Sequence, residues 1–144
     1  MIAVTVPARL ARVGELRTAL AGLEAYYAGH AHGPSPTELY AWGLALHEAA
    51  TNVVRHGHGG DSDAPITLTI EPAPDCVVFL LQDTGRPNPV WPYEPPARPS
   101  LDEGGYGLQI IHRVMDEVRY HRDPAGRNVL TLVARLKAAA ERRG

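Results

Sequence analysis

The chain has 144 residues, of which 44% are apolar and 21% charged, and its formal net charge is −2 at pH 7. This length suits a single domain with its own core, and the apolar share excludes a chain that is disordered throughout. The near-neutral charge argues against a dedicated nucleic-acid-binding protein, which usually carries a basic surplus.

The hydrophobic pattern predicts strands and helices in a regular succession. β-branched residues that alternate with polar ones indicate strands, whereas apolar residues three and four positions apart indicate helices. The predicted elements are a strand at 2–6, a helix at 8–28, a helix at 36–56, strands at 66–70 and 76–81, a helix at 106–116, and strands at 117–122 and 129–136. We expect residues 1–137 to form one domain and residues 138–144 to be a polar tail.

Some of these elements carry more specific expectations. Ser35 or Thr37 can cap the helix at 36–56. The unbroken apolar run at 76–81 favours a central strand buried on both faces or nearly so. The helix at 8–28 is expected to bury five residues at helical spacing, which are Leu10, Val13, Leu16, Leu20 and Leu23. We predict an α+β fold, a two-layer α/β sandwich with a mixed, mostly antiparallel sheet and helices on one face.

The sparse cysteine and lysine content excludes several kinds of site. Cys76 is the only cysteine, so the chain can form no internal disulfide and no zinc site with more than one thiolate. Lys137 is the only lysine, which excludes a P-loop and a eukaryotic-type protein kinase site. The sequence has no run of roughly 18 apolar residues and no secretory signal pattern at its start. We therefore expect a cytoplasmic protein without a membrane span.

The first motif lies within the helix at 36–56. Glu48 and Asn52 are four residues apart, so they share one helix face. A carboxylate and an amide at that spacing can share a cluster of Mg²⁺ and its waters. For an isolated pair, an ordinary surface pair of the i,i+4 type is the more frequent explanation.

Two further motifs contain glycine. Asp83 ends the apolar strand and is followed by Gly85, so its carboxylate can face a pocket or simply close a turn. Gly105 and Gly107 precede the helix at 106–116, where free N–H groups can meet phosphate. A dinucleotide-binding motif is excluded, because Ile110 stands where a third glycine is needed and no strand comes directly before.

Together and in this order, the three motifs resemble those of the GHKL (Bergerat-fold) ATPase superfamily. Residues 48–56 resemble the N box, residues 83–85 the G1 box and residues 105–108 the G2 box. Residues 115–136 are similar to the C-terminal part of small anti-sigma factor serine/threonine kinases. The resemblance spans roughly residues 3–136 and implies a histidine-kinase-like ATPase domain of the anti-sigma branch.

The resemblance implies a role for each N-box residue. Glu48 would act as the general base for a serine hydroxyl or a water. Asn52 would hold Mg²⁺, which bridges the phosphates of ATP. Arg55 would contact phosphate, and it keeps the positive charge that histidine kinases place there as lysine. Phosphoryl transfer depends on positioning and charge stabilisation, so the absence of an evident covalent nucleophile is no obstacle.

The same resemblance implies an adenine site. Asp83 would bind the amino group of adenine, while Gly85, Gly105 and Gly107 would shape the walls around the base and phosphates. Leu108 completes the G2 box and would also lie at the ATP site.

One position departs from the family pattern. These kinases often carry a threonine after the glycine of the last hairpin, where it supports the adenine site. Here Gly126 is followed by Arg127 and Asn128. Asn128 or the later Thr131 is therefore expected to take that place.

The segment at 84–104 corresponds to the ATP lid of the family. Six prolines lie between Pro87 and Pro99. Loops of this length in compact domains are usually functional lids or disordered. Because proline fixes φ, we expect a comparatively stiff lid that Trp91 and Tyr93 anchor.

The resemblance implies an ATP- and Mg²⁺-dependent protein serine/threonine kinase that regulates transcription. It would phosphorylate a STAS-type anti-sigma antagonist and bind a sigma factor, as a homodimer. Direct contact with nucleic acid or membrane is not expected. A non-catalytic ATP-binding module that sequesters a regulatory protein is the alternative. A third hypothesis is a metal-dependent hydrolase built on His47, His56 and His58, although their spacing fits no standard zinc site and helix capping explains the last two better.

Overall fold

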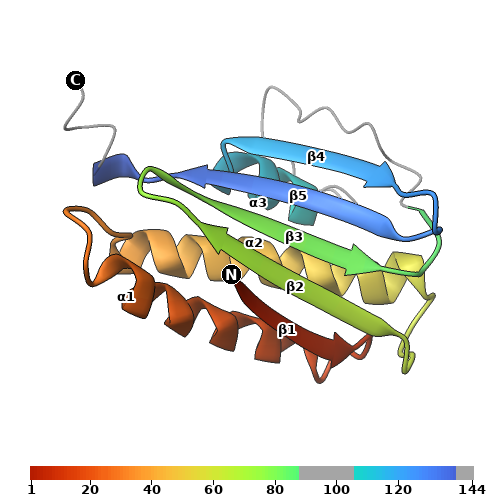
Figure 1. Ribbon diagram of the computed structural model, residues 1–144. Coiled ribbons are helices and arrows are strands. Elements are labelled where there is room, and N and C mark those ends of the chain that lie inside the picture. The colour runs from red at the N-terminus through yellow and green to blue at the C-terminus, as the bar shows by residue number, and fades with distance from the viewer. Residues whose placement is uncertain (88–105, 139–144) are drawn as a thin grey trace.

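The computed structural model describes residues 1–87 and 106–138 (Figure 1). Its elements in chain order are β1 (Ile2–Pro7), the 3-10 helix η1 (Val13–Ala21), α1 (Gly22–Tyr27), α2 (Pro36–Asn52), the π-helical turn η2 (Val53–Gly57), β2 (Pro65–Pro72), β3 (Cys76–Asp83), α3 (Tyr106–Val114), β4 (Glu117–Arg122) and β5 (Asn128–Arg135). The predicted lid from residue 88 on, with Trp91, Tyr93 and the adjoining Gly105, lies outside the described residues, as do residues 139–144 of the tail. In the described part of the chain, no helix is both long and apolar enough to cross a membrane.

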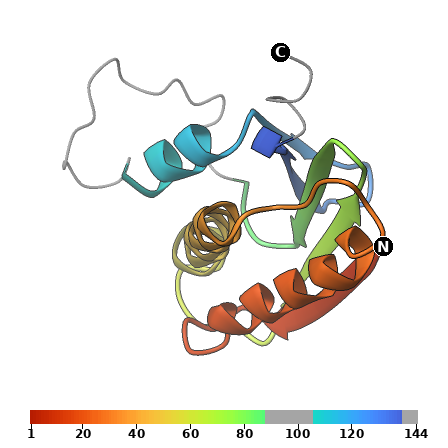
Figure 2. The same cartoon turned by 90° about the vertical axis from the view of Figure 1, so that its left-hand side faces the viewer.

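The five strands form one sheet in the order β1-β2-β3-β5-β4. All four pairings are antiparallel, so the sheet is fully antiparallel and not mixed as expected. The helices pack on one face of this sheet, so the molecule has two layers (Figures 1 and 2). The predicted α+β sandwich is confirmed.

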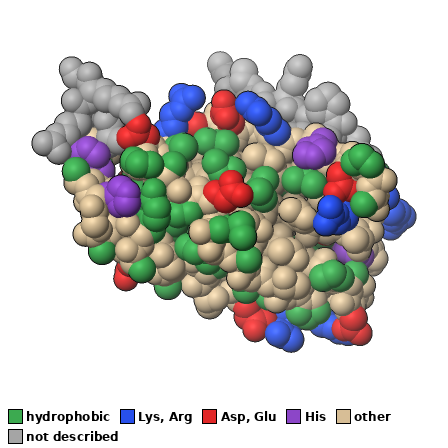
Figure 3. All heavy atoms as spheres, viewed as in Figure 1, with side chains coloured by type: hydrophobic (Ala, Val, Ile, Leu, Met, Phe, Trp, Pro, Cys, Tyr) green, Lys and Arg blue, Asp and Glu red, His purple; other side chains and the backbone are tan. Residues whose placement is uncertain are grey.

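The opposite face of the sheet has no helix over it among the described residues. Along β3 the burial alternates, with Phe79 and Leu81 almost fully buried and Val78 and Leu80 only half-buried. The strand is central as predicted, but the expected burial on both faces or nearly so is reached on one face only, because helices cover that face alone. Hydrophobic side chains are visible on the face that Figure 1 presents (Figure 3).

The predicted continuous helix at 8–28 is also wrong at its start. Helical structure begins only with η1, and it becomes α-helical only in α1. Leu10 is 43% exposed, whereas the other four residues predicted for the buried stripe are buried. The backbone before η1 bonds instead to the loop before β2, since Ala8 N donates to Ala64 O at 2.8 Å and Leu10 N to Asp61 Oδ1 at 2.9 Å.

Helix α2 begins with a capping box. Ser35 Oγ accepts a hydrogen bond from Glu38 N at 3.1 Å, and Ser35 N donates to Glu38 Oε1 at 3.0 Å. This arrangement satisfies backbone N–H groups that the first helical turn leaves free, and it confirms Ser35 as the cap. The second oxygen of the buried Glu38 accepts from Lys137 N at 3.2 Å. One carboxylate thus ties the start of α2 to the chain that follows β5.

The end of α2 differs from a plain α-helix. The α-helix ends at Asn52, and residues 53–57 form a single π-helical turn, where a regular helix to residue 56 was expected. The turn closes with a hydrogen bond from His58 N to Val53 O at 3.1 Å. Such turns often occur at functional sites, because the additional residue redirects the backbone that follows.

The capping box predicts a specific stability effect. Replacing Ser35 with Ala removes the acceptor for Glu38 N, and we expect a loss of about 1 kcal/mol in the free energy of unfolding. Urea denaturation followed by circular dichroism measures it. Thr37→Ala is the matched control, since this exposed residue of the same turn caps nothing. Equal effects of the two substitutions would contradict the role of the cap.

Candidate functional site

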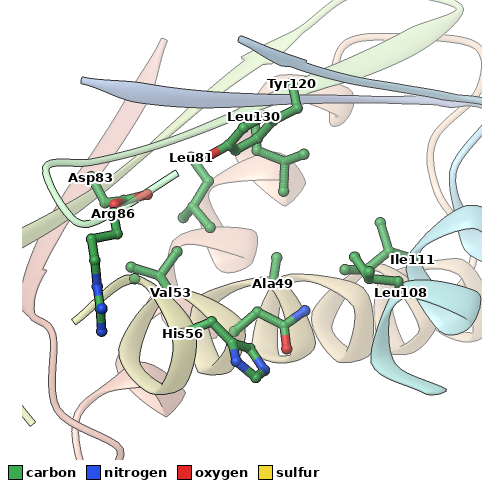
Figure 4. A pocket seen from close by; sticks show the side chains of 12 residues that line it. Ala49, Val53, His56, Leu81, Asp83, Arg86, Leu108, Ile111, Tyr120 and Leu130 are labelled. Carbon is green, nitrogen blue, oxygen red and sulfur yellow. The ribbon is translucent and has the colours of Figure 1, made fainter. Parts of the chain in front are cut away.

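A cavity of about 40 Å³ lies between the sheet and the helices α2 and α3 (Figure 4). Its apolar lining comes from Ala49, Val53, Leu81, Leu108, Ile111 and Leu130. Its polar lining comes from Asn52, His56, Asp83, Arg86 and Tyr120. An apolar hollow with a few polar groups is the usual form of a small-molecule site, although such sites commonly hold roughly 300–1,000 Å³. A ligand as large as a nucleotide would therefore have to widen this cavity.

Asp83 lines the cavity, and behind it lie its hydrogen-bond partners Gly85 and Asn128. Asp83 Oδ1 accepts hydrogen bonds from Gly85 N at 2.8 Å and from Asn128 Nδ2 at 3.0 Å. The same Nδ2 donates to Gly85 O at 2.8 Å. Asp83 and Asn128 are direct partners in the β3–β5 register, and they are 7% and 1% exposed. The structure thus brings three of the predicted site residues together, with the Asp83 carboxylate directed towards the cavity (Figure 4).

Two glycine backbones meet beside this carboxylate. A Cβ atom built on Gly85 would lie 2.7 Å from Gly57 O and 2.8 Å from Gly57 C, which is too close for any real side chain. A hydrogen bond from Arg86 N to Gly57 O at 2.7 Å also joins the two segments. The π-helical turn and the turn after β3 are therefore packed backbone against backbone, and only glycine fits at position 85.

The predicted N-box and G2-box residues also converge. A Cβ atom on Gly107 would lie 2.8 Å from Glu48 Oε2 and 3.8 Å from Asn52 Nδ2. The start of α3 is therefore in contact with the face of α2 that carries the carboxylate and the amide. Both side chains are half-buried, and Leu108 turns into the cavity wall. A helix N-terminus beside these groups is a suitable place for an anionic ligand.

An outer cavity of about 400 Å³ adjoins the inner one, and its lining consists of Arg55, His56, Arg86 and Pro87. His56 and Arg86 line both cavities. The exposed guanidinium groups of Arg55 and Arg86 give the outer cavity a positive lining. The arrangement suits a ligand with an apolar, amino-bearing end and an anionic end.

Some residues of this site were not found from the sequence. Arg86 directly follows the motif at 83–85, and this position next to a site motif is the sequence feature that could have identified it. Tyr120 shares one face of the predicted strand at 117–122 with Val118, and this pattern indicates no cavity. For His56 the sequence indicates a helix cap or a metal ligand, and neither interpretation places it in this cavity.

The structure does not bring Thr131 to the cavity. Thr131 pairs with Leu80 on β3 and with Arg119 on β4, and both of its neighbours, Leu130 and Leu132, are buried. Because side chains alternate along a strand, Thr131 belongs to the sheet face that is turned away from the helices. Of the two candidates for the family threonine, only Asn128 lies beside Asp83.

The histidines form no metal centre in the described part of the chain. Within residues 1–87 and 106–138, no three side chains of His, Cys, Asp or Glu are placed to hold a metal ion together. The hypothesis of a hydrolase built on the histidine cluster therefore finds no ligand set among these residues.

Comparison with known proteins gives concordant matches. The family model of the histidine kinase-like ATPase domain matches residues 6–134. The chain is 29% identical over 126 residues to the serine-protein kinase RsbW of Bacillus subtilis (strain 168), which covers 82% of this chain and 76% of that protein. It is 30% identical over 91 residues to the anti-sigma F factor of Priestia megaterium, covering 60% of this chain and 62% of that protein. These matches confirm the resemblance that the three motifs indicated.

A solved structure shows the same fold. The histidine kinase domain of the blue-light activated histidine kinase EL346 from Erythrobacter litoralis superposes with a TM-score of 0.57 at 18% identity. The match covers 90% of this chain and 61% of that chain, so the present chain spans about three fifths of the histidine kinase domain.

The contact between the two glycines predicts the effect of a single methyl group. Gly85→Ala places Cβ against Gly57 O, so we expect a loss of about 1–3 kcal/mol in the free energy of unfolding. The added methyl group would push the turn after β3 away from Gly57 and move the carboxylate of Asp83 with it. We therefore expect binding of Mg²⁺–ATP, measured by calorimetry, to weaken as well. Gly29→Ala is the control, because nothing lies within 4 Å of a Cβ there. Undiminished stability and binding in Gly85→Ala would contradict the close approach.

Proposed function

The chain belongs to the histidine kinase-like ATPase domain family, and on that basis we propose that it is an ATP- and Mg²⁺-dependent protein serine/threonine kinase. One observation carries the proposal. Asp83 and Asn52, the residues expected to bind the base and the metal, line the same mostly apolar cavity. Glu48 lies one helical turn from Asn52, where it can reach the phosphate end of a ligand in that cavity.

The nucleotide would span the two cavities. Its base would enter the inner cavity, with the amino group on Asp83 and the ring between Leu81, Leu108 and other apolar side chains. Its phosphates would extend towards the positive lining that Arg55 and Arg86 provide. Separate apolar and cationic regions match the two chemically different ends of ATP.

The residues around Asn52 fit a magnesium ion. The amide oxygen of Asn52 is an oxygen ligand, and Mg²⁺ usually takes one or two protein ligands together with phosphates and waters. Gly107 has no side chain, so the backbone at the start of α3 can lie close to the carboxylate of Glu48 and the amide of Asn52. When bound, Mg²⁺ would neutralise charge on the phosphate oxygens.

Glu48 would act as the general base. Its carboxylate takes the proton of a serine or threonine hydroxyl of the protein substrate as the hydroxyl oxygen forms a bond to the γ-phosphorus. The bond between the γ-phosphorus and the bridging oxygen breaks, and ADP leaves with that electron pair. Asn52 and the arginines hold the phosphates in place during this exchange.

The names of the relatives support a place in sigma-factor regulation. One relative is a serine-protein kinase and another an anti-sigma F factor. We propose that the substrate is a STAS-type anti-sigma antagonist and that the chain, as a homodimer in the cytoplasm, binds a sigma factor. If ATP binds but no phosphate is transferred, the non-catalytic partner-switching module becomes the better description.

The kinase proposal is tested with labelled ATP, Mg²⁺ and STAS proteins encoded near this chain. We expect a phosphoserine or phosphothreonine product with the wild type. Glu48→Gln should keep ATP affinity within about twofold but lower the transfer rate by roughly 10²–10⁴, the usual contribution of a general base. Asn52→Ala should lose the dependence of ATP binding on Mg²⁺.

Glu24→Gln is the matched control, because it removes an exposed carboxylate on α1 that lies outside the site. Transfer by Glu48→Gln at the wild-type rate would remove Glu48 as the base. Failure of the wild type to bind ATP would refute the proposal as a whole.

A further inference from the structure

The side-chain amide of Asn128 has one possible orientation. Its Nδ2 group has two hydrogen atoms, and it donates to Asp83 Oδ1 and to Gly85 O. Turning the amide around would place an oxygen against two acceptor oxygens in a position that is 1% exposed. That exchange would replace two hydrogen bonds by repulsion, so the donor side of Asn128 is fixed on Asp83 and Gly85.

This orientation makes the two oxygens of Asp83 unequal. Oδ1 already accepts two hydrogen bonds, from Gly85 N and Asn128 Nδ2. Among the described residues, Oδ2 has no hydrogen-bond donor. Because the carboxylate is directed towards the cavity (Figure 4), Oδ2 is the oxygen available to a ligand.

The hydrogen-bond donors around Asp83 already have partners within the protein. Gly85 N and both hydrogens of Asn128 Nδ2 have partners, whereas Asp83 Oδ2 and the buried Asn128 Oδ1 are acceptors without one among the described residues. A ligand edge that meets Asp83 Oδ2 must therefore bring a donor. A carbonyl oxygen in that place would face a carboxylate oxygen, and a buried unpaired acceptor is costly.

We propose that Asn128 is a positioning residue that sets the choice of nucleotide. By occupying Oδ1 of Asp83 and the carbonyl of Gly85, it leaves Oδ2 as the acceptor for the 6-amino group of adenine and excludes purines with a 6-carbonyl group. The inference rests on the proposed function, in which ATP binds in this cavity. In this proposal Asn128 orients Asp83 and does not itself contact the base.

Calorimetry with three nucleotides tests the inference. The probes are Mg²⁺ complexes of ATP, of purine riboside triphosphate, which lacks the 6-amino group, and of inosine triphosphate, which has a 6-carbonyl group. In Asn128→Ala, we expect ATP affinity to fall about tenfold or more, the usual effect of losing a hydrogen bond to a charged group. Affinity for purine riboside triphosphate should change by less than about threefold, because that ligand does not use Asp83.

The preference for ATP over inosine triphosphate should shrink in the same variant. Gln82→Ala is the matched control, since Gln82 is an amide side chain next to Asp83 on the opposite sheet face. Equal losses for ATP and purine riboside triphosphate would show a merely structural role and overturn the inference. Unchanged ATP affinity in Asn128→Ala would overturn it as well.

A second variant guards against a folding defect. Asn128→Asp keeps the shape of the side chain but sets a second carboxylate against Asp83. A proton shared between the two carboxylates can replace the lost N–H donor, and its uptake is favoured as the pH falls. We expect the ATP affinity of this variant, relative to the wild type, to rise between about pH 7.5 and about pH 5.5.

The wild-type protein supplies the reference for this pH series. His56 on η2, Arg86 after β3 and Tyr120 on β4 line the same cavity and are present in both proteins, so the two proteins differ only at position 128. A ratio that does not change with pH would contradict the inference. If the wild type itself binds no ATP, the proposed function fails, whereas ATP binding that ignores Asn128 refutes this inference alone.

Discussion

The candidate site depends on one close approach between two backbones. The turn after β3 and the π-helical turn after α2 touch at Gly85 and Gly57, where no Cβ could be accommodated at position 85. This contact fixes the end of β3 against the end of α2, the longest helix among the described residues. Asp83 is the last residue of β3, and Asn52 is the last residue of α2. Both residues line one cavity, and the contact between the two turns holds the ends of β3 and α2 beside it.

The one-sided sheet explains how polar groups come to be buried in this domain. Helices cover only the inner face, so each strand sends alternate side chains into the core, and most of these are apolar. Asp83 and Asn128 are exceptions at the ends of β3 and β5. They are direct partners in the sheet, and each satisfies part of the other's hydrogen-bonding need. A buried polar group is tolerated where a partner of matching chemistry is held beside it.

The two cavities differ in the charge of the side chains that line them. The inner cavity ends in the carboxylate of Asp83, whereas the outer cavity is lined by Arg55 and Arg86. With a single lysine in the chain, arginine supplies the positive charge near the site. Its planar group holds phosphate oxygens in a fixed geometry, which suits a reaction that depends on positioning.

The sequence by itself determined the motif residues and the kind of fold, because helical spacing, strand alternation and glycine next to acidic residues are local properties. It thereby placed Glu48 and Asn52 on one helix face. Only the tertiary structure decided what these elements meet. The start of the first helix is unwound by hydrogen bonds to a loop some fifty residues away, and Asn128 rather than Thr131 reaches Asp83 because the strand register selects one face. Contacts between distant segments depend on packing, which no local pattern encodes.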